Sequence, residues 1–165
     1  MSVRGQRVLV TGGTGFLGRC VTAELDAQGA TAIAVGSADY DLRDRDQIRR
    51  MLADHRVDAV VHLAAVLGGI GANRAEPGRF FYENAIMGIE LIEACRAAGI
   101  GKTVIAGTAS SYPKDAPVPF TEEDFWNGYP HESEAAFALA KKMLLAQVIA
   151  YRAQYGMNLV YLVPV

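Results

Sequence analysis

The sequence predicts an α/β fold in which a parallel sheet is flanked by helices, and two observations support this prediction. Short apolar runs bounded by glycine alternate with longer helical patterns along the whole chain, which is typical of consecutive βαβ units. The chain has 165 residues, 51% of them hydrophobic, which is enough for one domain with a real core and too short for two ordinary domains. We therefore expect a single domain over residues 1–165.

The expected strands are five short apolar runs. In chain order they are Arg7–Val10, Thr31–Val35, Asp58–Leu63, Thr103–Ala106 and Leu159–Val163. The helical patterns between them carry boundary signals. Gly29, Gly99 and Gly156 each follow such a pattern as a carboxyl-terminal stop, and Asp44 with Gln47 resembles an amino-terminal capping pair.

One long irregular stretch interrupts the alternation. Residues 110–133 lie between a strand and a helix and hold four of the six prolines. Because loops of this length are usually functional or mobile, we expect it to lie over a binding crevice.

Composition argues against several classes of function. A net charge of −2 leaves no basic surplus to attract nucleic acid, and the amino terminus lacks an apolar run long enough for a signal core or a membrane span. Cys20 and Cys95 have neither metal-binding nor redox spacing, so we interpret both as buried small hydrophobes, which fits a reducing cytoplasm. We expect a cytoplasmic protein with no metal site, nucleic-acid partner or membrane association.

A glycine-rich turn follows the first strand directly. Gly12, Gly15 and Gly18 have G-x-x-G-x-x-G spacing, and a helix is expected from about Phe16. A dinucleotide's pyrophosphate needs close backbone approach and free N–H groups at a helix start, and this arrangement supplies both. A tight strand–helix turn needs glycine for conformational reasons too, but the flanking strands favour dinucleotide binding on a Rossmann-type, doubly wound sheet.

The sequence leaves open whether the dinucleotide is NAD or NADP. An acidic residue at the end of the second strand would hold the ribose 2′-hydroxyl of NAD, and an arginine would hold the 2′-phosphate of NADP. Gly36 and Ser37 supply neither group. Asp39 and Asp41 come slightly later; Asp41 could reach the adenine amine, and both are equally well interpreted as solvated loop carboxylates.

Several segments together resemble a known family. They are "VTGGTGFLG", "YDLRD", "HLAA" at His62–Ala65, "GGIGAN" at Gly68–Asn73, "PGRFFYENAIMGIELIEACR" at Pro77–Arg96, "SYPK" at Ser111–Lys114, "EEDFWNGYP" and "AKKMLLAQ". Nearly end to end, the chain is similar to the extended short-chain dehydrogenases/reductases that act on nucleotide sugars (NAD-dependent epimerases/dehydratases), most closely to the GDP-L-fucose synthases. Such proteins continue beyond "YLVPV" into a substrate-binding part. The resemblance implies NADP or NAD as cofactor, bound by Gly12, Thr14, Gly15, Phe16, Leu17, Gly18, Asp41, Leu42, Leu63, Ala64, Ala65 and Lys141.

The resemblance also implies a catalytic arrangement. In this family a keto-sugar is reduced by hydride transfer coupled to proton donation from a tyrosine, while a lysine four residues later orients the nicotinamide ribose and a Ser or Thr hydroxyl holds the carbonyl. Positions i and i+4 share one helix face, which suits this pairing. Lys141 and Thr108 match the lysine and the hydroxyl. Phe137 stands where the tyrosine is expected.

Two further departures concern acid/base chemistry. The family's epimerisation uses a cysteine and a histidine. Ser110 occupies the cysteine position, and a hydroxyl is a far weaker acid than a thiol. None of His55, His62 and His131 matches the histidine; we interpret His55 and His131 as exposed and His62 as a structural strand-end residue near the cofactor.

These departures predict an NAD(P)-binding protein without stand-alone keto-sugar reductase activity. Removing a general acid typically costs on the order of 10²–10⁴ in rate. Three alternatives stay open: an oxidoreductase or epimerase that uses another acid, such as Tyr112 or Tyr129, or a partner subunit; a regulatory or assembly module; and a shortened chain carrying deliberate substitutions at positions 110 and 137.

The helices expected at 80–98 and 134–155 are apolar on more than one face, so we expect both to be buried against neighbouring elements on two sides. Similar proteins pair these helices in a dimer interface, so we expect a homodimer or a partner chain. The apolar residues are Phe81, Ile86, Ile89, Leu91 and Ile92 in the first, and Leu139, Met143, Leu144, Leu145, Val148 and Ile149 in the second.

Overall fold

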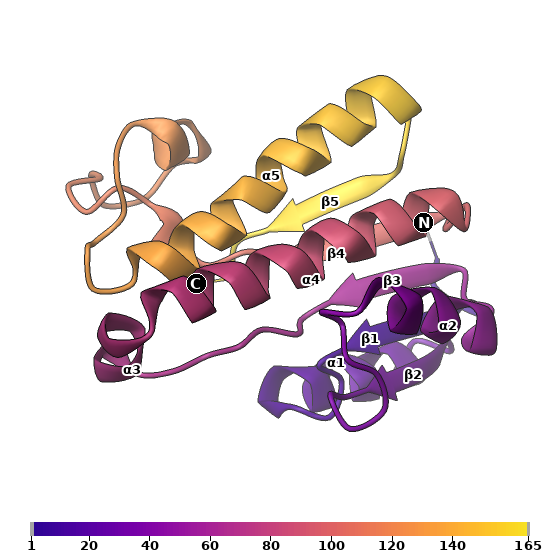
Figure 1. The fold of residues 1–165 in the computed structure, drawn as a ribbon. Helices are drawn as coiled ribbons and strands as arrows, with labels where there is room; N and C mark the ends of the chain where they lie inside the picture. Colours follow the sequence, from indigo (N-terminus) through magenta and orange to yellow (C-terminus); the bar gives the residue numbers. More distant parts are fainter. Residues whose placement is uncertain (1, 165) are drawn as a thin grey trace.

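In the computed structural model, which describes residues 2–164, the five apolar runs form one parallel sheet with helices on both faces (Figure 1). The sheet order is β2-β1-β3-β4-β5. The strands are β1 (Arg7–Thr11), β2 (Thr31–Val35), β3 (Ala59–His62), β4 (Lys102–Ala106) and β5 (Leu159–Leu162). The predicted fold class and all five predicted strands are therefore confirmed, and no strand end differs from its predicted position by more than one residue.

In the part of the chain that the structure describes, five α-helices and two short 3₁₀ helices connect the strands. They are α1 (Phe16–Ala27), α2 (Arg45–His55), α3 (Ile70–Ala75), α4 (Pro77–Ala97), α5 (Ala135–Tyr155), η1 (Ala109–Ser111) and η2 (Glu122–Trp126). The chain runs from β1 outward to β2 and then returns past β1 to β3. Because such crossovers are right-handed, this reversal places α1 on one face of the sheet and α2, α4 and α5 on the other.

The core fills the space between the sheet and the three helices on one face. Its larger part joins β1, β2 and β3 to α2 and α4, and includes the fully buried Leu9, Ile48 and Leu91. A second cluster joins β4 and β5 to α4 and α5 through Ile105, Leu144 and Leu159, among others. Close helix packing at this second cluster depends on Gly88 in α4, where a Cβ would overlap the side chain of Leu144.

The predicted boundary signals act as expected. Gly29, Gly99 and Gly156 have φ angles of +82°, +67° and +65° and end α1, α4 and α5, a backbone conformation that glycine adopts without steric cost. The Asp44 side chain accepts hydrogen bonds from the backbone N–H groups of Asp46 and Gln47 and caps α2.

Two expectations need correction, and one helix was not predicted. Cys20 is exposed, because it lies on the solvent face of α1, which buries only Gly18. Cys95 is buried as expected, and burial raises the pKa of its thiol to about 12. His55 is half-buried rather than exposed, because its ring packs edge-on against the Tyr40 ring, with the two ring centroids 5.9 Å apart. The six-residue helix α3 was not predicted, since so short a segment shows no helical periodicity.

Within residues 2–164, no helix combines the length and the hydropathy that crossing a bilayer requires.

Candidate functional site

The turn after β1 is built from glycines that allow three segments to approach one another. Gly12 has φ +69°, and a Cβ there would lie 2.9 Å from the backbone nitrogen of Ala64, at the end of β3. Gly18 lies in the first turn of α1, where a Cβ would come 2.6 Å from Gly13 Cα and closer still to Gly12 O. Gly13, which the motif did not single out, donates its N–H to both Val10 O and Val35 O at 3.1 Å.

The start of α1 is suited to an anion. Gly15 is the N-cap residue, and the first turn contains no acidic side chain. The free N–H groups of such a first turn, together with the helix dipole, attract phosphate. The backbone there can also be approached closely, because the capping residue has no side chain.

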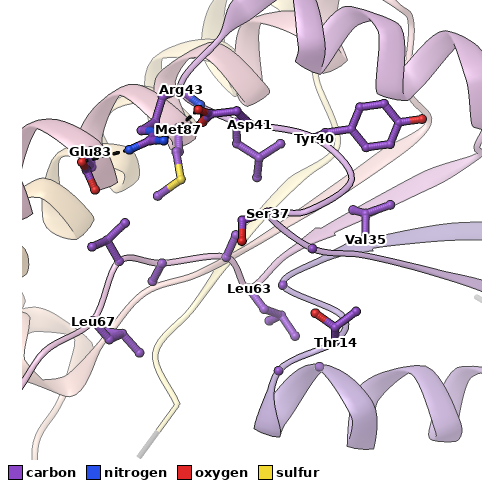
Figure 2. A pocket seen from close by; sticks show the side chains of 18 of the residues that line it. Thr14, Val35, Ser37, Tyr40, Asp41, Arg43, Leu63, Leu67, Glu83 and Met87 are labelled. Carbon is purple, nitrogen blue, oxygen red and sulfur yellow. Dashed lines mark hydrogen bonds and ion pairs between the residues drawn. The ribbon is translucent and has the colours of Figure 1, made fainter.

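A cavity of about 640 Å³ opens at the carboxyl ends of β1, β2 and β3 (Figure 2). This is the point where the strand order reverses, the usual ligand site of an open parallel sheet. Every predicted cofactor-binding residue lines it except Lys141: Gly12, Thr14, Gly15, Phe16, Leu17, Gly18, Asp41, Leu42, Leu63, Ala64 and Ala65. Its volume lies within the range of small-molecule sites.

Sequence reasoning did not assign the other side of this cavity. Arg79, Glu83 and Met87 come from α4, Val35 is the last residue of β2, and Gly36, Ser37, Tyr40, Arg43, Val66 and Leu67 follow β2 or β3. The residues after β2 could have been inferred, because the ends of parallel strands meet at one edge of the sheet. The α4 residues carry no local signal of this position.

Ion pairs organise the charges at this cavity. Arg43 donates to both carboxylate oxygens of Asp41 at 2.8 Å and to Glu83 Oε1 at 3.0 Å. These hydrogen bonds from Arg43 lower the pKa of Asp41 to about 2. Asp41 is therefore a paired carboxylate rather than a freely solvated one. Asp39 does not line this cavity: its Oδ2 accepts the Gly36 N–H at 2.8 Å, and it lines a separate cavity beside β2.

A second group of predicted residues lies where β4 ends and α5 begins. Thr108 Oγ1 accepts the Ser110 N–H at 3.2 Å and caps η1. Ser110 Oγ donates a 2.7 Å hydrogen bond to Glu134 Oε2. Phe137 and Lys141 have i, i+4 spacing and so share one side of α5, and Glu134 is the N-cap residue of that helix. Glu134 was not predicted, because only the fold brings it to Ser110.

Lys141 and His62 are two buried basic groups at the same edge of the sheet. Lys141 is 3% exposed, and burial lowers its pKa to about 8. His62 is fully buried, with Nδ1 2.8 Å from Thr11 Oγ1 and no hydrogen-bond partner for Nε2 within residues 2–164. Burial, together with the nearby Lys141 charge, holds the pKa of His62 well below its ordinary value. His62 is therefore neutral at pH 7.

The long loop does not lie over the cavity, contrary to expectation, since none of residues 110–133 is among its lining. The loop leaves β4, which is separated from β1 by β3, and it packs toward α5 instead (Figure 1). Lys142 anchors it: its Nζ lies 5.1 Å from the ring centroids of both Phe125 and Trp126 and 3.4 Å from the carbonyl oxygens of Ser111 and Gly128.

The two tyrosines considered as substitute acids differ in their surroundings. Tyr112 is buried, with its ring stacked on Phe120 at 4.5 Å and edge-on to Phe125 at 5.1 Å. Tyr129 is exposed. His131 is exposed as predicted, and its Nδ1 lies 2.8 Å from Ser133 Oγ.

Comparison with known proteins places this site in context. A GDP-L-fucose synthase from Sinorhizobium fredii is 31% identical over 160 residues, which cover 97% of this chain and 51% of that protein. The structure of a GDP-L-fucose synthetase from Naegleria fowleri bound to NADP matches with a TM-score of 0.83 and 31% identity, covering 96% of this chain and 52% of that one. A Thermus thermophilus UDP-glucose 4-epimerase in complex with NAD matches with a TM-score of 0.81 and 28% identity, covering 94% and 53%.

The chain spans about half the length of the curated relatives it matches. The model of the NAD dependent epimerase/dehydratase family matches residues 8–165, nearly the whole chain. The sheet order, the glycine turn and the cavity at the strand reversal agree with that match. The chain therefore belongs to the NAD dependent epimerase/dehydratase family.

Proposed function

We propose that this chain is the dinucleotide-binding part of a protein of nucleotide-sugar oxidoreductase ancestry, and that it binds NAD(P)(H) without supporting tyrosine-dependent keto-sugar reduction on its own. One observation carries the binding proposal. The turn at Gly12, Gly15 and Gly18 has no room for added Cβ atoms at two of these positions and borders the cavity at the strand reversal. A pyrophosphate fits there, because it needs backbone N–H groups and close approach.

The catalytic half of the proposal rests on position 137. The Phe137 ring is buried on the same side of α5 as Lys141, and a phenyl ring has no proton to donate. Lys141 would hold the nicotinamide ribose, and the Thr108 hydroxyl lies at the end of β4 where it could hold a carbonyl. The bound dinucleotide would supply the hydride. The chain's own residues would bind and orient the dinucleotide and the carbonyl group. The phenol that would protonate the carbonyl oxygen, however, is replaced by the phenyl ring of Phe137.

The test compares the natural chain with Phe137→Tyr. Both are titrated with NADH and NADPH by calorimetry and then followed for nicotinamide oxidation with a panel of 4-keto nucleotide sugars. Both should bind, and hydride transfer by Phe137→Tyr should exceed that of the natural chain by about 10² or more, the usual contribution of a positioned general acid. Equal turnover by the two proteins would contradict the proposal.

A second candidate function is favoured by one contact. The hydrogen bond between Ser110 and Glu134 holds a carboxyl group at the N-cap of α5, three residues before Phe137, and a carboxyl group can serve in general acid–base catalysis. If the natural chain turns over in the same assay, Glu134→Gln should abolish that activity. Unchanged turnover in Glu134→Gln would exclude Glu134 as the acid.

We further propose that the chain forms a homodimer through α4 and α5. These helices pack side by side (Figure 1) and leave large apolar side chains in water, including Phe81 at 41% and Ile149 at 54% exposure. Covering such groups is favourable by roughly 25 cal/mol per Å². Light scattering at micromolar concentration should show a dimer that Ile149→Glu dissociates. A monomeric natural chain would contradict this proposal.

A further inference from the structure

The carboxyl end of β2 decides which dinucleotide such a cavity accepts, because the adenosine ribose binds beside it in this fold. In this chain Gly36 and Ser37 follow β2, and both line the cavity. Figure 2 shows Ser37 at its edge. A Cβ at Gly36 would lie 2.8 Å from Thr14 Oγ1, so that position stays small. Ser37 is therefore the first side chain after β2 that can contact the 2′-position.

The cations that line the cavity are already paired. Arg43 is held by Asp41 and Glu83, and Arg79 is held by Glu76 at 2.9 Å and Glu83 at 3.4 Å. Two of these carboxylates, Asp41 and Glu83, line the cavity together with the two arginines. The lining charges therefore balance. A 2′-phosphate would have to displace one of these carboxylates or lie beside it without a free cation, which is costly for a dianion.

The remaining nearby charges do not change this balance. Arg19, on α1, donates its Nε–H to Thr14 O at 2.9 Å and is not part of the cavity lining. Asp39 is not part of the cavity lining either, and its carboxylate accepts the Gly36 N–H. The neutral hydroxyls of Ser37 and of Thr14, which lies beside Gly36, can donate and accept and are thus the uncharged polar groups offered to the ribose edge.

We infer that this cavity selects the dinucleotide with a free ribose 2′-hydroxyl, NAD(H), over the 2′-phosphorylated NADP(H), with Ser37 as the specificity-determining position. The inference rests on the proposed function, since it names which dinucleotide the same cavity takes. Family membership leaves this choice open, because one solved relative is bound to NADP and another is in complex with NAD.

The experiment titrates the natural chain with NADH and with NADPH at low and at physiological salt. NADH should bind about tenfold more tightly or better, a difference that one unpaired phosphate contact readily produces. The difference in affinity should persist at physiological salt, because it arises from the lack of a free cation for the 2′-phosphate and not from a net charge of the lining. Equal or tighter binding of NADPH would overturn the inference alone. Absence of binding by both dinucleotides would overturn the proposed function and this inference with it.

Two variants test the assigned position and the charge balance separately. Ser37→Arg should reverse the order, because its guanidinium can pair with the 2′-phosphate. Ser37→Gln, a long polar side chain without charge, should keep NADH the tighter ligand. Glu83→Gln removes the carboxylate that contacts both arginines and leaves the cavity lining with one positive charge in excess, so it should narrow the difference in affinity between NADH and NADPH without altering Ser37. This variant keeps the inference testable if Ser37→Arg does not fold. An unchanged ratio in both Ser37→Arg and Glu83→Gln would overturn it.

Discussion

Gly18→Ala is expected to abolish dinucleotide binding, with a loss of affinity of at least about 100-fold. The added methyl group would overlap Gly12 O and lie 2.6 Å from Gly13 Cα. Because both contacts are backbone, relief requires the first turn of α1 to move away from the end of β1, and overpacking of this kind costs about 1–3 kcal/mol. The displaced N–H groups would no longer converge on a pyrophosphate. Calorimetric titration with NADH and thermal unfolding measure the two effects.

Two other glycine substitutions separate loss of the site from loss of the fold. Gly71→Ala, in α3, adds a methyl group with no neighbour within 4 Å, so both stability and affinity should be preserved. Gly15→Ala meets only Gly12 O at 3.2 Å and has an ordinary φ of −79°. It should therefore fold normally while obstructing close approach of a phosphate. Full affinity in Gly15→Ala would show that this turn is not the pyrophosphate site.

The fold could be predicted from sequence because its signals are local. Each strand is a contiguous apolar run, and the helix ends are marked by glycines with positive φ or by the Asp44 cap. The glycine turn could be assigned for the same reason, and parallel pairing then brings Leu63, Ala64 and Ala65 to the same edge. A parallel sheet converts sequence positions after successive strands into neighbours in space.

The interactions that sequence reasoning missed join segments with no shared local pattern. Arg43 and Glu83 are 40 residues apart, and Ser110 and Glu134 are 24 apart across an irregular loop. The pairing of such groups depends on helix placement, which periodicity does not report. The prediction that Cys20 is buried was wrong for a related reason. Cysteine is buried on average, but Gly18, which packs against the turn, is the only buried residue of α1.

The position of Lys141 also follows from the fold rather than from its spacing. The cavity spans the ends of β1, β2 and β3, whereas α5 packs beside β4 and β5. Lys141 therefore lies beyond the cavity lining, buried near His62. An extended dinucleotide that places its pyrophosphate at the glycine turn would have to reach toward β4 to meet it, which agrees with Thr108 lying at the end of that strand.

Lys141→Met is expected to stabilise the dinucleotide-free protein while weakening dinucleotide binding. Burial lowers the pKa of Lys141 from 10.5 to about 8, which corresponds to a cost of charge burial of up to about 3 kcal/mol. Methionine keeps a similar shape without the charge, so the midpoint of denaturant unfolding at pH 7 should rise. Affinity for NADH should fall by about tenfold or more, because a charged hydrogen bond to the ribose is lost.

The pH dependence of stability tests whether the buried Lys141 charge destabilises the fold. Between about pH 8 and the ordinary lysine value of 10.5, the unfolded chain holds the Lys141 proton and the folded chain does not. The free energy of unfolding of the natural chain should therefore rise relative to that of Lys141→Met as pH increases through this window. Below pH 8 the difference between the two free energies should not change with pH. Lys142→Met is the control: that ammonium contacts two aromatic rings and two carbonyl oxygens, so its removal should destabilise the protein at pH 7. A Lys141→Met variant less stable than the natural chain at pH 7 would show that the Lys141 charge stabilises the fold, and its role would then be structural.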